Sequence, residues 1–196
     1  MNTKMKKSIA TREIAITAIL LAICIVSQVY KNISVYITGP VINACIILAI
    51  YTTNLTCALG LCVITPITAY FIAASPVMMA VPGIVPFIIL GNCILAVSVW
   101  FFKEKNSCEK GSVSEKISAI VKSVLCAVAK AAFMGVTISV WLLPTFIPQG
   151  SPLRGKMNVF QLTFSVTQFI TALIGFVYAY AVLTALRHSH IGTEAD

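Results

Sequence analysis

The chain has 196 residues, of which 59% are hydrophobic and only 10% are charged, and its mean hydropathy is +0.96. This composition excludes an ordinary soluble domain and indicates a protein that crosses a membrane several times. The formal net charge of +8 would also suit a nucleic-acid-binding protein. However, most Lys and Arg residues flank apolar segments, so the positive-inside rule explains them without a nucleic-acid partner.

A helix that crosses the bilayer needs about 20 residues, so a chain of this length has room for about six spans and their loops. Six apolar segments are expected to form them. They cover residues 13–30, 40–51, 57–74, 84–102, 119–143 and 160–186. The predicted fold is therefore all-α: residues 1–196 form one compact bundle of six transmembrane helices. The basic tail before the first span would also suit a secretory signal peptide, but no small-residue cleavage site follows the apolar run.

Turn residues and charges mark the boundaries of these spans. Tyr36 is expected in a loop over residues 32–39, and Pro40 suits the first turn of the second span. Pro66 should kink the third span. Further loops are predicted at 52–56, 75–83, 103–116 and 145–159. His188 and His190 lie in a polar tail, where we expect them to be solvated rather than bound to a metal.

The seven cysteines lack metal-ligand spacing and lie mostly in apolar runs, so we expect them to be small buried residues: Cys24, Cys45, Cys57, Cys62, Cys93, Cys108 and Cys126.

Charge predicts the orientation of the bundle. With six spans both termini share one side, and that side carries ten Lys and Arg residues against three, Lys31, Arg154 and Lys156, on the other. The positive-inside rule then places both termini in the cytoplasm. All six carboxylates fall on that same side. A site that opens outward would therefore attract anions and disfavour cations.

One charged residue lies inside an apolar span. Lys130 is near the middle of the segment Ser123–Pro144. An ammonium group there costs about 2.5–3.5 kcal/mol on insertion scales, so it needs a partner. No Asp or Glu lies in the interior of an apolar segment. The partner is therefore a backbone carbonyl, a neutral side chain, water or a ligand, and we favour a ligand.

Other polar residues lie at a similar predicted depth. Asn92 is about 12 Å below the outer end of the fourth span, and Gln168 and Thr137 are about as deep in the sixth and fifth. Helical spacing puts four residues of the fifth span on one face: Lys130, Met134, Thr137 and Trp141. A polar site between three helices is the predicted function of these groups. The alternative is that they only bond neighbouring helices, as is common in bundles.

Ala15, Ala18 and Ala22 share one face of the first span. Small residues let another helix approach closely, either inside the bundle or in a partner protein.

The sequence contains no motif of a serine hydrolase, zinc protease or ATP-binding loop, and no intramembrane Asp or His pair. We therefore expect neither an enzyme nor a cofactor or metal in this chain. Without an energy source of its own, the chain is either a passive binder or one subunit of a driven complex.

The sequence resembles the substrate-binding S components of energy-coupling factor (ECF) vitamin transporters over nearly its whole length. The resemblance lies in the alanine motif Ala18–Ala22, GPVIN at Gly39–Asn43, a proline in the third span, PGIVPFIILGN at Pro82–Asn92, Lys130 in KAAFMG, and Gln168 before FITALIG.

The resemblance implies a multi-pass subunit of a prokaryotic plasma membrane that binds a micronutrient near its outer side. A transmembrane coupling protein with two cytoplasmic ATPases would drive uptake, with ATP used only by those partners. By this mapping Ala15, Ala18 and Ala22 dock the coupling protein. The implied substrate-binding residues are Lys130, Asn92, Gln168, Thr137, Asn43 and, stacking on a ring, Trp141 and Tyr36.

The lack of outer or embedded acids favours an anionic or neutral polar substrate, such as a carboxylate vitamin or a heterocycle, over a cation. The alternative function is a scaffold subunit of an envelope assembly complex, without a bound small molecule or ATPase partners.

Overall fold

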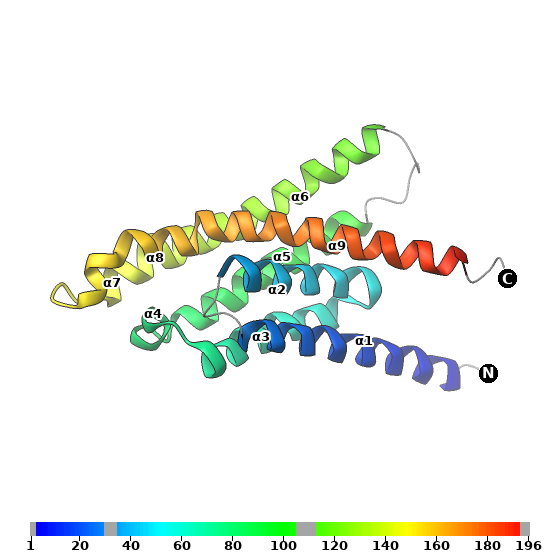
Figure 1. The fold of residues 1–196 in the computed structure, drawn as a ribbon, viewed down its shortest axis with the longest axis horizontal. Helices are drawn as coiled ribbons and strands as arrows, with labels where there is room; N and C mark the ends of the chain where they lie inside the picture. Colours follow the sequence, from blue (N-terminus) through cyan, green and yellow to red (C-terminus); the bar gives the residue numbers. More distant parts are fainter. Residues whose placement is uncertain (1–2, 30–34, 105–112, 193–196) are drawn as a thin grey trace.

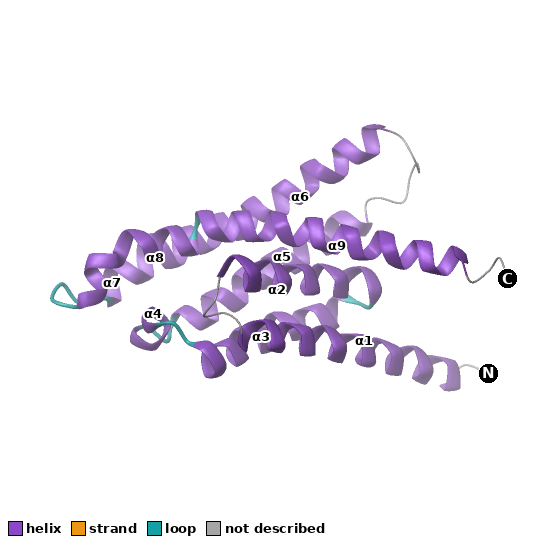
Figure 2. Cartoon of the chain, viewed as in Figure 1, coloured by secondary structure: helices purple, strands orange, loops and turns teal. Residues whose placement is uncertain are grey.

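The structure, a computed structural model, describes the backbone of residues 3–29, 35–104 and 113–192 and the side chains of residues 11–29, 36–103 and 117–186. In this part of the chain every regular element is a helix, as the sequence predicts (Figures 1 and 2). The elements are α1 (Thr3–Val29), α2 (Val35–Thr52), α3 (Leu55–Ala73), α4 (Pro76–Ala80), α5 (Ile84–Glu104), α6 (Val113–Met134), the π-helix η1 (Gly135–Leu142), α7 (Leu143–Phe146), the 3₁₀-helix η2 (Pro152–Lys156), α8 (Met157–Phe164) and α9 (Val166–Gly192).

Five apolar stretches of the described helices are long enough to cross a membrane. They are Thr11–Val29, Leu55–Ala73, Ile84–Lys103, Ile117–Phe146 and Pro152–Leu186. Each overlaps one of the predicted spans, which confirms that the described chain is helical and is compatible with a multi-pass membrane protein. The second predicted span corresponds to a shorter apolar helix, Tyr36–Thr52. The six-span arrangement and the orientation of the termini stay predictions.

The second predicted span begins too late. α2 starts at Val35, so Tyr36 lies in its first turn rather than in a loop, and Pro40 lies inside the helix. Pro40 is the sixth residue of α2, beyond the first four N–H groups that have no partner within a helix, so it removes one hydrogen bond from α2. The predicted loop over residues 75–83 also contains a short helix, α4, which begins with Pro76.

The last two spans form a hairpin that is less regular than predicted. The fifth span passes from α6 into η1 at Gly135 and continues through α7 to Phe146. The sixth is two helices, because Ser165 has φ −120° and ψ −87° and separates α8 from α9. The two irregular points touch, since a Cβ added at Gly135 would lie 3.3 Å from the Cβ of Ser165.

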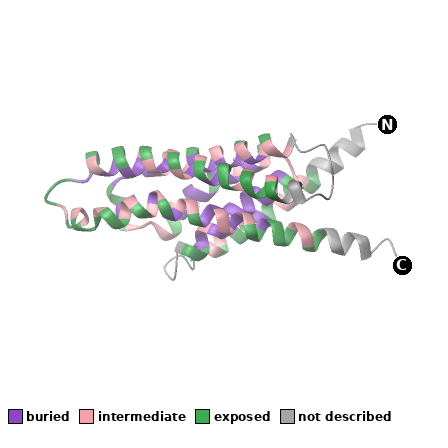
Figure 3. Cartoon of the chain, turned by 90° about the horizontal axis from the view of Figure 1, so that it is seen from above, coloured by how far each residue is buried: buried purple, intermediate pink, exposed green. Residues whose placement is uncertain are grey.

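Buried apolar side chains form two separate clusters. Figure 3 marks the buried positions along the helices in purple. The inner core joins α1, α2, α3 and the later half of α5, with Cys126 and Ala179 from α6 and α9. The outer core joins α4, the start of α5, η1, α7 and α8, with Met134 from the end of α6. Four of the predicted buried cysteines, Cys24, Cys45, Cys62 and Cys126, are buried, all in the inner core.

Cys57 and Cys93 are only partly buried. Cys108 lies outside the described residues, as do the side chains of His188 and His190.

Two side-chain hydrogen bonds show where α1 ends and where α2 begins relative to α3. Gln28 Nε2 donates to the carbonyl of Thr65 at 2.9 Å, and Thr38 Oγ1 donates to the carbonyl of Ser27 at 3.1 Å. The end of α1 and the start of α2 therefore lie beside the middle of α3. From Thr65, α3 continues to Ala73, about 12 Å further at 1.5 Å per residue. α3 therefore extends beyond the end of α1, and its Tyr70 packs against the outer core.

Candidate functional site

Lys130 lies at the centre of a polar cluster made by three helices. Its Nζ donates to Asn43 Oδ1 of α2 at 2.6 Å and to Asn92 Oδ1 of α5 at 2.8 Å. Exposed fractions are only 2% for Lys130, 2% for Asn43 and 4% for Asn92. The partners are neutral side chains, one of the alternatives that the sequence left open. We call these three residues the polar cluster.

The polar cluster separates the two apolar cores. On α6, Lys130 lies one turn after Cys126, an inner-core residue, and one turn before Met134, an outer-core residue. On α5, Asn92 likewise lies between Ile88, which packs on the outer core, and Leu95 of the inner core. Helical spacing alone thus brings these two polar side chains to one level.

Close helix packing positions Asn43 in the polar cluster. A Cβ added at Gly175 of α9 would lie 2.6 Å from the Cβ of Asn43, and one at Gly39 would lie 3.0 Å from Thr171. Glycine at both places lets α2 and α9 approach closely, as small residues do in membrane bundles. Gly91 serves α5 and α6 in the same way, because a Cβ there would lie 2.7 Å from Met134.

The hydrogen bonds determine which way the two amides point. An ammonium group only donates, so both Oδ1 atoms face Lys130 and both Nδ2 groups face away from it. Within the part of the chain that the structure describes, neither Nδ2 donates a hydrogen bond, and Lys130 Nζ makes only these two. The polar cluster thus has donors to spare, while each of its acceptors already accepts from Nζ.

The nearest described carboxylate does not compensate Lys130. Glu13 is the only acidic residue whose side chain the structure describes. Its Oε2 accepts from Asn54 Nδ2 at 2.8 Å, at the turn between α2 and α3. That turn follows Thr52, the last residue of α2, whereas Asn43 lies nine residues earlier in the same helix. Among the described residues, the ammonium group of Lys130 is therefore bonded only to neutral side chains. The expectation that an outward-opening site attracts anions stays a prediction.

The structure does not bring Gln168 into hydrogen-bond contact with Lys130. Gln168 Nε2 donates to the carbonyl of Thr163 at 3.2 Å, across the break at Ser165. The break leaves carbonyls without a helical donor, and an amide side chain nearby satisfies one of them. A role of Gln168 in a binding site stays a prediction.

Thr137 and Trp141 do not share the buried face of Lys130 and Met134. The residues buried after Met134 are Ile138 and Leu142, whereas Trp141 is 53% exposed. The π-helical turns of η1 add a residue per turn, so the buried face recurs every four residues instead of alternating between three and four. Thr137 Oγ1 donates to the carbonyl of Phe133 in its own helix, at 2.7 Å.

The two predicted aromatic contacts lie on the surface of the described fold. Trp141 makes an edge-on contact with Phe87 of α5, with ring centroids 5.9 Å apart. Tyr36, in the first turn of α2, is 57% exposed. Neither ring packs against the polar cluster in this structure.

The three alanines of the first span lie on an outward face of α1. Ala15, Ala18 and Ala22 are all exposed. The neighbouring Ile19 and Ile23 are exposed by 61% and 46%. This face is therefore not used for packing within the described chain.

Sequence reasoning missed Gln28. This side chain is fully buried, and while its Nε2 bonds to Thr65, its Oε1 has no hydrogen-bond partner among the described residues. Thr65 directly precedes Pro66 in α3 and accepts a second bond, from Thr68 Oγ1 at 3.0 Å. The signal that could have found Gln28 is an amide side chain inside an apolar span, which is the same signal that indicated Asn92.

Comparisons with models of protein families, with curated proteins and with solved structures found no match to this chain.

Proposed function

We propose that this chain is the substrate-binding subunit of a membrane uptake system, of the S-component kind that its sequence resembles. Its substrate would be an anionic or neutral polar micronutrient, such as a carboxylate vitamin or a polar heterocycle, bound at the polar cluster. A coupling protein and two ATPases in the plasma membrane would supply the energy. The chain itself would carry no catalytic group and no cofactor.

The surplus of donors in the polar cluster carries this proposal. An ammonium group has three N–H donors and each amide nitrogen has two, but only two bonds to described atoms form. A ligand that complements them brings acceptors, as carboxylate and ring carbonyl groups do. Hydrogen bonds to a charged group contribute about 1.5–3 kcal/mol each, so Lys130 would be the strongest contact.

The position of the polar cluster supports uptake from the outer side. The polar cluster lies between the two cores, and the irregular elements of the outer core lie beyond it. A π-helix and a broken helix leave more backbone groups open to rearrangement than regular α-helices do, and π-helical turns recur at functional sites. Gln28, with its unused Oε1, lies at the same boundary and would accept a bond from a donor on the substrate.

The exposed alanine face of α1 supports docking of the coupling protein, because small side chains permit close contact with another helix. Replacing Ala18 with Trp would block that approach. The expected result is loss of the ATPases from a pull-down with the chain. Val177→Trp, at a position on α9 that is 65% exposed, is the matched control and should keep them.

The direct test is native mass spectrometry of protein purified gently from cells grown in rich medium. The wild type should retain a small molecule, and titration with that molecule should show binding weakened about 10- to 100-fold in Lys130→Met, the ratio expected for one charged hydrogen bond. Lys156→Met changes an exposed lysine and is the control. Equal affinity of Lys130→Met and Lys156→Met would remove Lys130 from the site.

A scaffold subunit without a substrate is the second candidate function. The observation in its favour is that Lys130 already has two acceptors at 2.6 and 2.8 Å and is almost fully buried. The polar cluster would then only tie α2, α5 and α6 together. This function predicts a protein free of any small molecule, and a loss of stability in Lys130→Met without any change in binding.

A further inference from the structure

The last hairpin of the bundle changes its helical geometry in both of its helices at one level. Gly135 begins the π-helix η1, and Ser165 separates α8 from α9. The two residues are in contact, since a Cβ added at Gly135 would lie 3.3 Å from the Cβ of Ser165. Hinges consist of a few residues at the ends of elements, which absorb a change in φ and ψ. Two such residues side by side allow the part of the hairpin beyond them to turn as a body.

Hydrogen bonds join residues 135–164, which we call the lid, into one unit. Ser139 and Gln161 exchange two bonds, because the side chain of each donates to the carbonyl of the other. At the far end, Arg154 Nη1 donates to two backbone carbonyls of the segment 144–147, each at 3.0 Å. These bonds hold η1, α7 and α8 together, so a movement of the lid concentrates at its hinge.

The lid packs against α4 and the start of α5 through apolar side chains. Ile138 lies in the outer core with Val77 and Ile84. The ring of Trp141 meets Phe87 edge-on. Apolar contacts are non-directional, so the lid can part from α4 and α5 without breaking the hydrogen bonds that hold it together.

Met134 lies between the hinge and the polar cluster. It directly precedes Gly135, it is one turn beyond Lys130, and it is 0% exposed. Its side chain fits against Gly91, where an added Cβ would lie 2.7 Å from Met134 Cγ. Gly91 directly precedes Asn92 of the polar cluster. Met134 therefore covers the side of the polar cluster that faces the outer core, with a side chain that adapts readily to new contacts.

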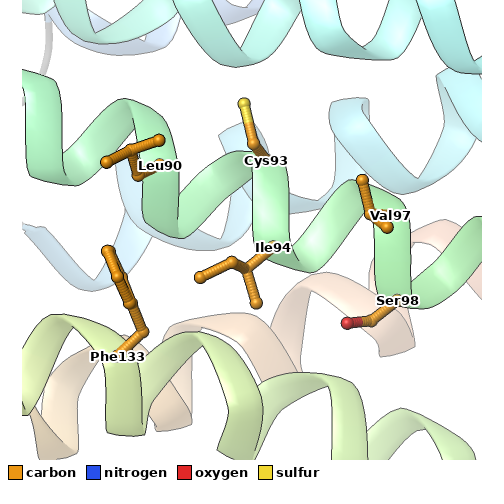
Figure 4. A pocket seen from close by; sticks show the side chains of 6 residues that line it. All are labelled: Leu90, Cys93, Ile94, Val97, Ser98 and Phe133. Atoms are coloured by element: carbon orange, nitrogen blue, oxygen red, sulfur yellow. The ribbon is translucent and has the colours of Figure 1, made fainter.

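The same turn of α6 borders a lateral groove of about 320 Å³ beside α5. Phe133 faces the groove from α6, and α5 contributes the rest of its lining: Leu90, Cys93, Ile94, Val97 and Ser98 (Figure 4). Closely packed interiors resist rearrangement because they contain few voids. The groove supplies free volume beside the turn that has to change when the hairpin bends.

We propose that the lid is hinged at Gly135 and Ser165 and opens the polar cluster. When the lid turns away from α4 and α5, Met134 leaves Gly91, and the polar cluster becomes accessible from the end of the bundle that the lid covers. The hinge is a property of the fold and does not depend on the proposed uptake function, for which the lid would be the entrance.

The test is the rate at which a water-soluble anionic methanethiosulfonate modifies introduced cysteines in the full chain in nanodiscs. Met134→Cys places a thiol under the lid, and Leu95→Cys places one in the inner core, at two positions that are 0% exposed. Mass spectrometry of peptides separates these thiols from the native cysteines. Met134→Cys should react at least about tenfold faster, because local opening needs less free energy than opening of the core. Ile138→Cys, also 0% exposed, repeats the comparison if Met134→Cys does not fold.

A second substitution locates the hinge. Gly135→Ala restricts the backbone at the hinge and should slow the modification of Met134→Cys by about 2- to 5-fold, the ratio expected for one glycine replaced by alanine. Gly60→Ala in α3, whose added Cβ has no atom within 4 Å, is the matched control and should leave the rate unchanged. Equal rates for Met134→Cys and Leu95→Cys would show that the lid does not open. A rate in Gly135→Ala that is not lower than in Gly60→Ala would refute the hinge.

Discussion

The inner and outer cores are built from different side chains. Nine of the 17 buried residues of the inner core are Ala or Cys, whereas the ten of the outer core are Val, Met, Ile, Leu and Phe. Small side chains let the inner helices approach closely and stay regular. The outer core fills wider gaps with large side chains, and its helices are short, π-helical or broken. The inner core is thus closely packed and regular. The outer core and its irregular helices, which we call the cap, lie on the other side of the polar cluster.

The difference suggests that the two cores have different tasks. Interiors packed at high density resist rearrangement, since even one methylene group alters their stability. A cap of flexible methionines and irregular helices rearranges more easily, as Met adapts to changing contacts. The following predictions test whether the inner core holds the fold while the outer core moves on its own.

The largest effect is expected from cavities in the two cores. Ile47 of the inner core and Ile138 of the outer core are 1% and 0% exposed. Replacing either with Ala should lower the free energy of unfolding by about 2–5 kcal/mol. In hydrogen exchange followed by mass spectrometry, Ile47→Ala should speed exchange in all the inner helices, but Ile138→Ala only in residues 135–164. Equal spread of the two effects would show that both cores unfold as one unit.

A smaller effect is expected where α2 meets α9. Gly175→Ala places a Cβ 2.6 Å from Asn43 Cβ and 3.1 Å from the carbonyl of Pro40. Overpacking of this kind costs about 1–3 kcal/mol, so the midpoint of thermal unfolding in detergent should fall. Gly60→Ala in α3, which has no atom within 4 Å of its added Cβ, should leave the midpoint unchanged or raise it. A neutral Gly175→Ala would contradict the close approach of these helices.

The smallest effect is expected within the cap. Ser139 Oγ donates to the carbonyl of Gln161 at 2.9 Å, and Gln161 Nε2 donates to the carbonyl of Ser139 at 3.0 Å. Ser139→Ala removes one of these ties between η1 and α8, which should cost about 0.5–1.5 kcal/mol. Thr163→Ala removes only a bond within α8 and is the control. Faster hydrogen exchange of η1 in Ser139→Ala, but not in Thr163→Ala, would support the role of Ser139 in holding η1 against α8.

The polar cluster shows how far sequence reasoning reached. The cost of burying an ammonium group predicted that Lys130 needs a partner, and the absence of acids left neutral side chains among the choices. The resemblance added Asn43 to the set of site residues, but nothing in the sequence paired it with Lys130. That contact joins residues 43 and 130 across the bundle. Gly175 and Gly39 permit it by bringing α9 against α2, and such packing has no signature in either segment alone.

The face of the fifth span shows where helical periodicity failed. A spacing rule assumes 3.6 residues per turn, and it holds for Lys130 and Met134 in α6. It fails from Gly135 onward, because the π-helical turns of η1 are wider and rotate Trp141 to the surface. Likewise, the sixth span was predicted as one helix, but Ser165 interrupts it, and Gln168 Nε2 bonds to the carbonyl of Thr163 across the break. Local propensities gave no warning of either irregularity.

By itself, the sequence determined that the chain is an apolar helical protein, where its long spans lie, and that Lys130 needs a partner other than an Asp or Glu of an apolar span. These properties depend on hydrophobicity and charge, which each segment carries independently of the others. Only the tertiary structure decided that Asn43 and Asn92 are those partners, that two cores meet at their level, and that the last hairpin is irregular there. These properties depend on contacts between distant segments, where the fit of one helix against another outweighs local preference.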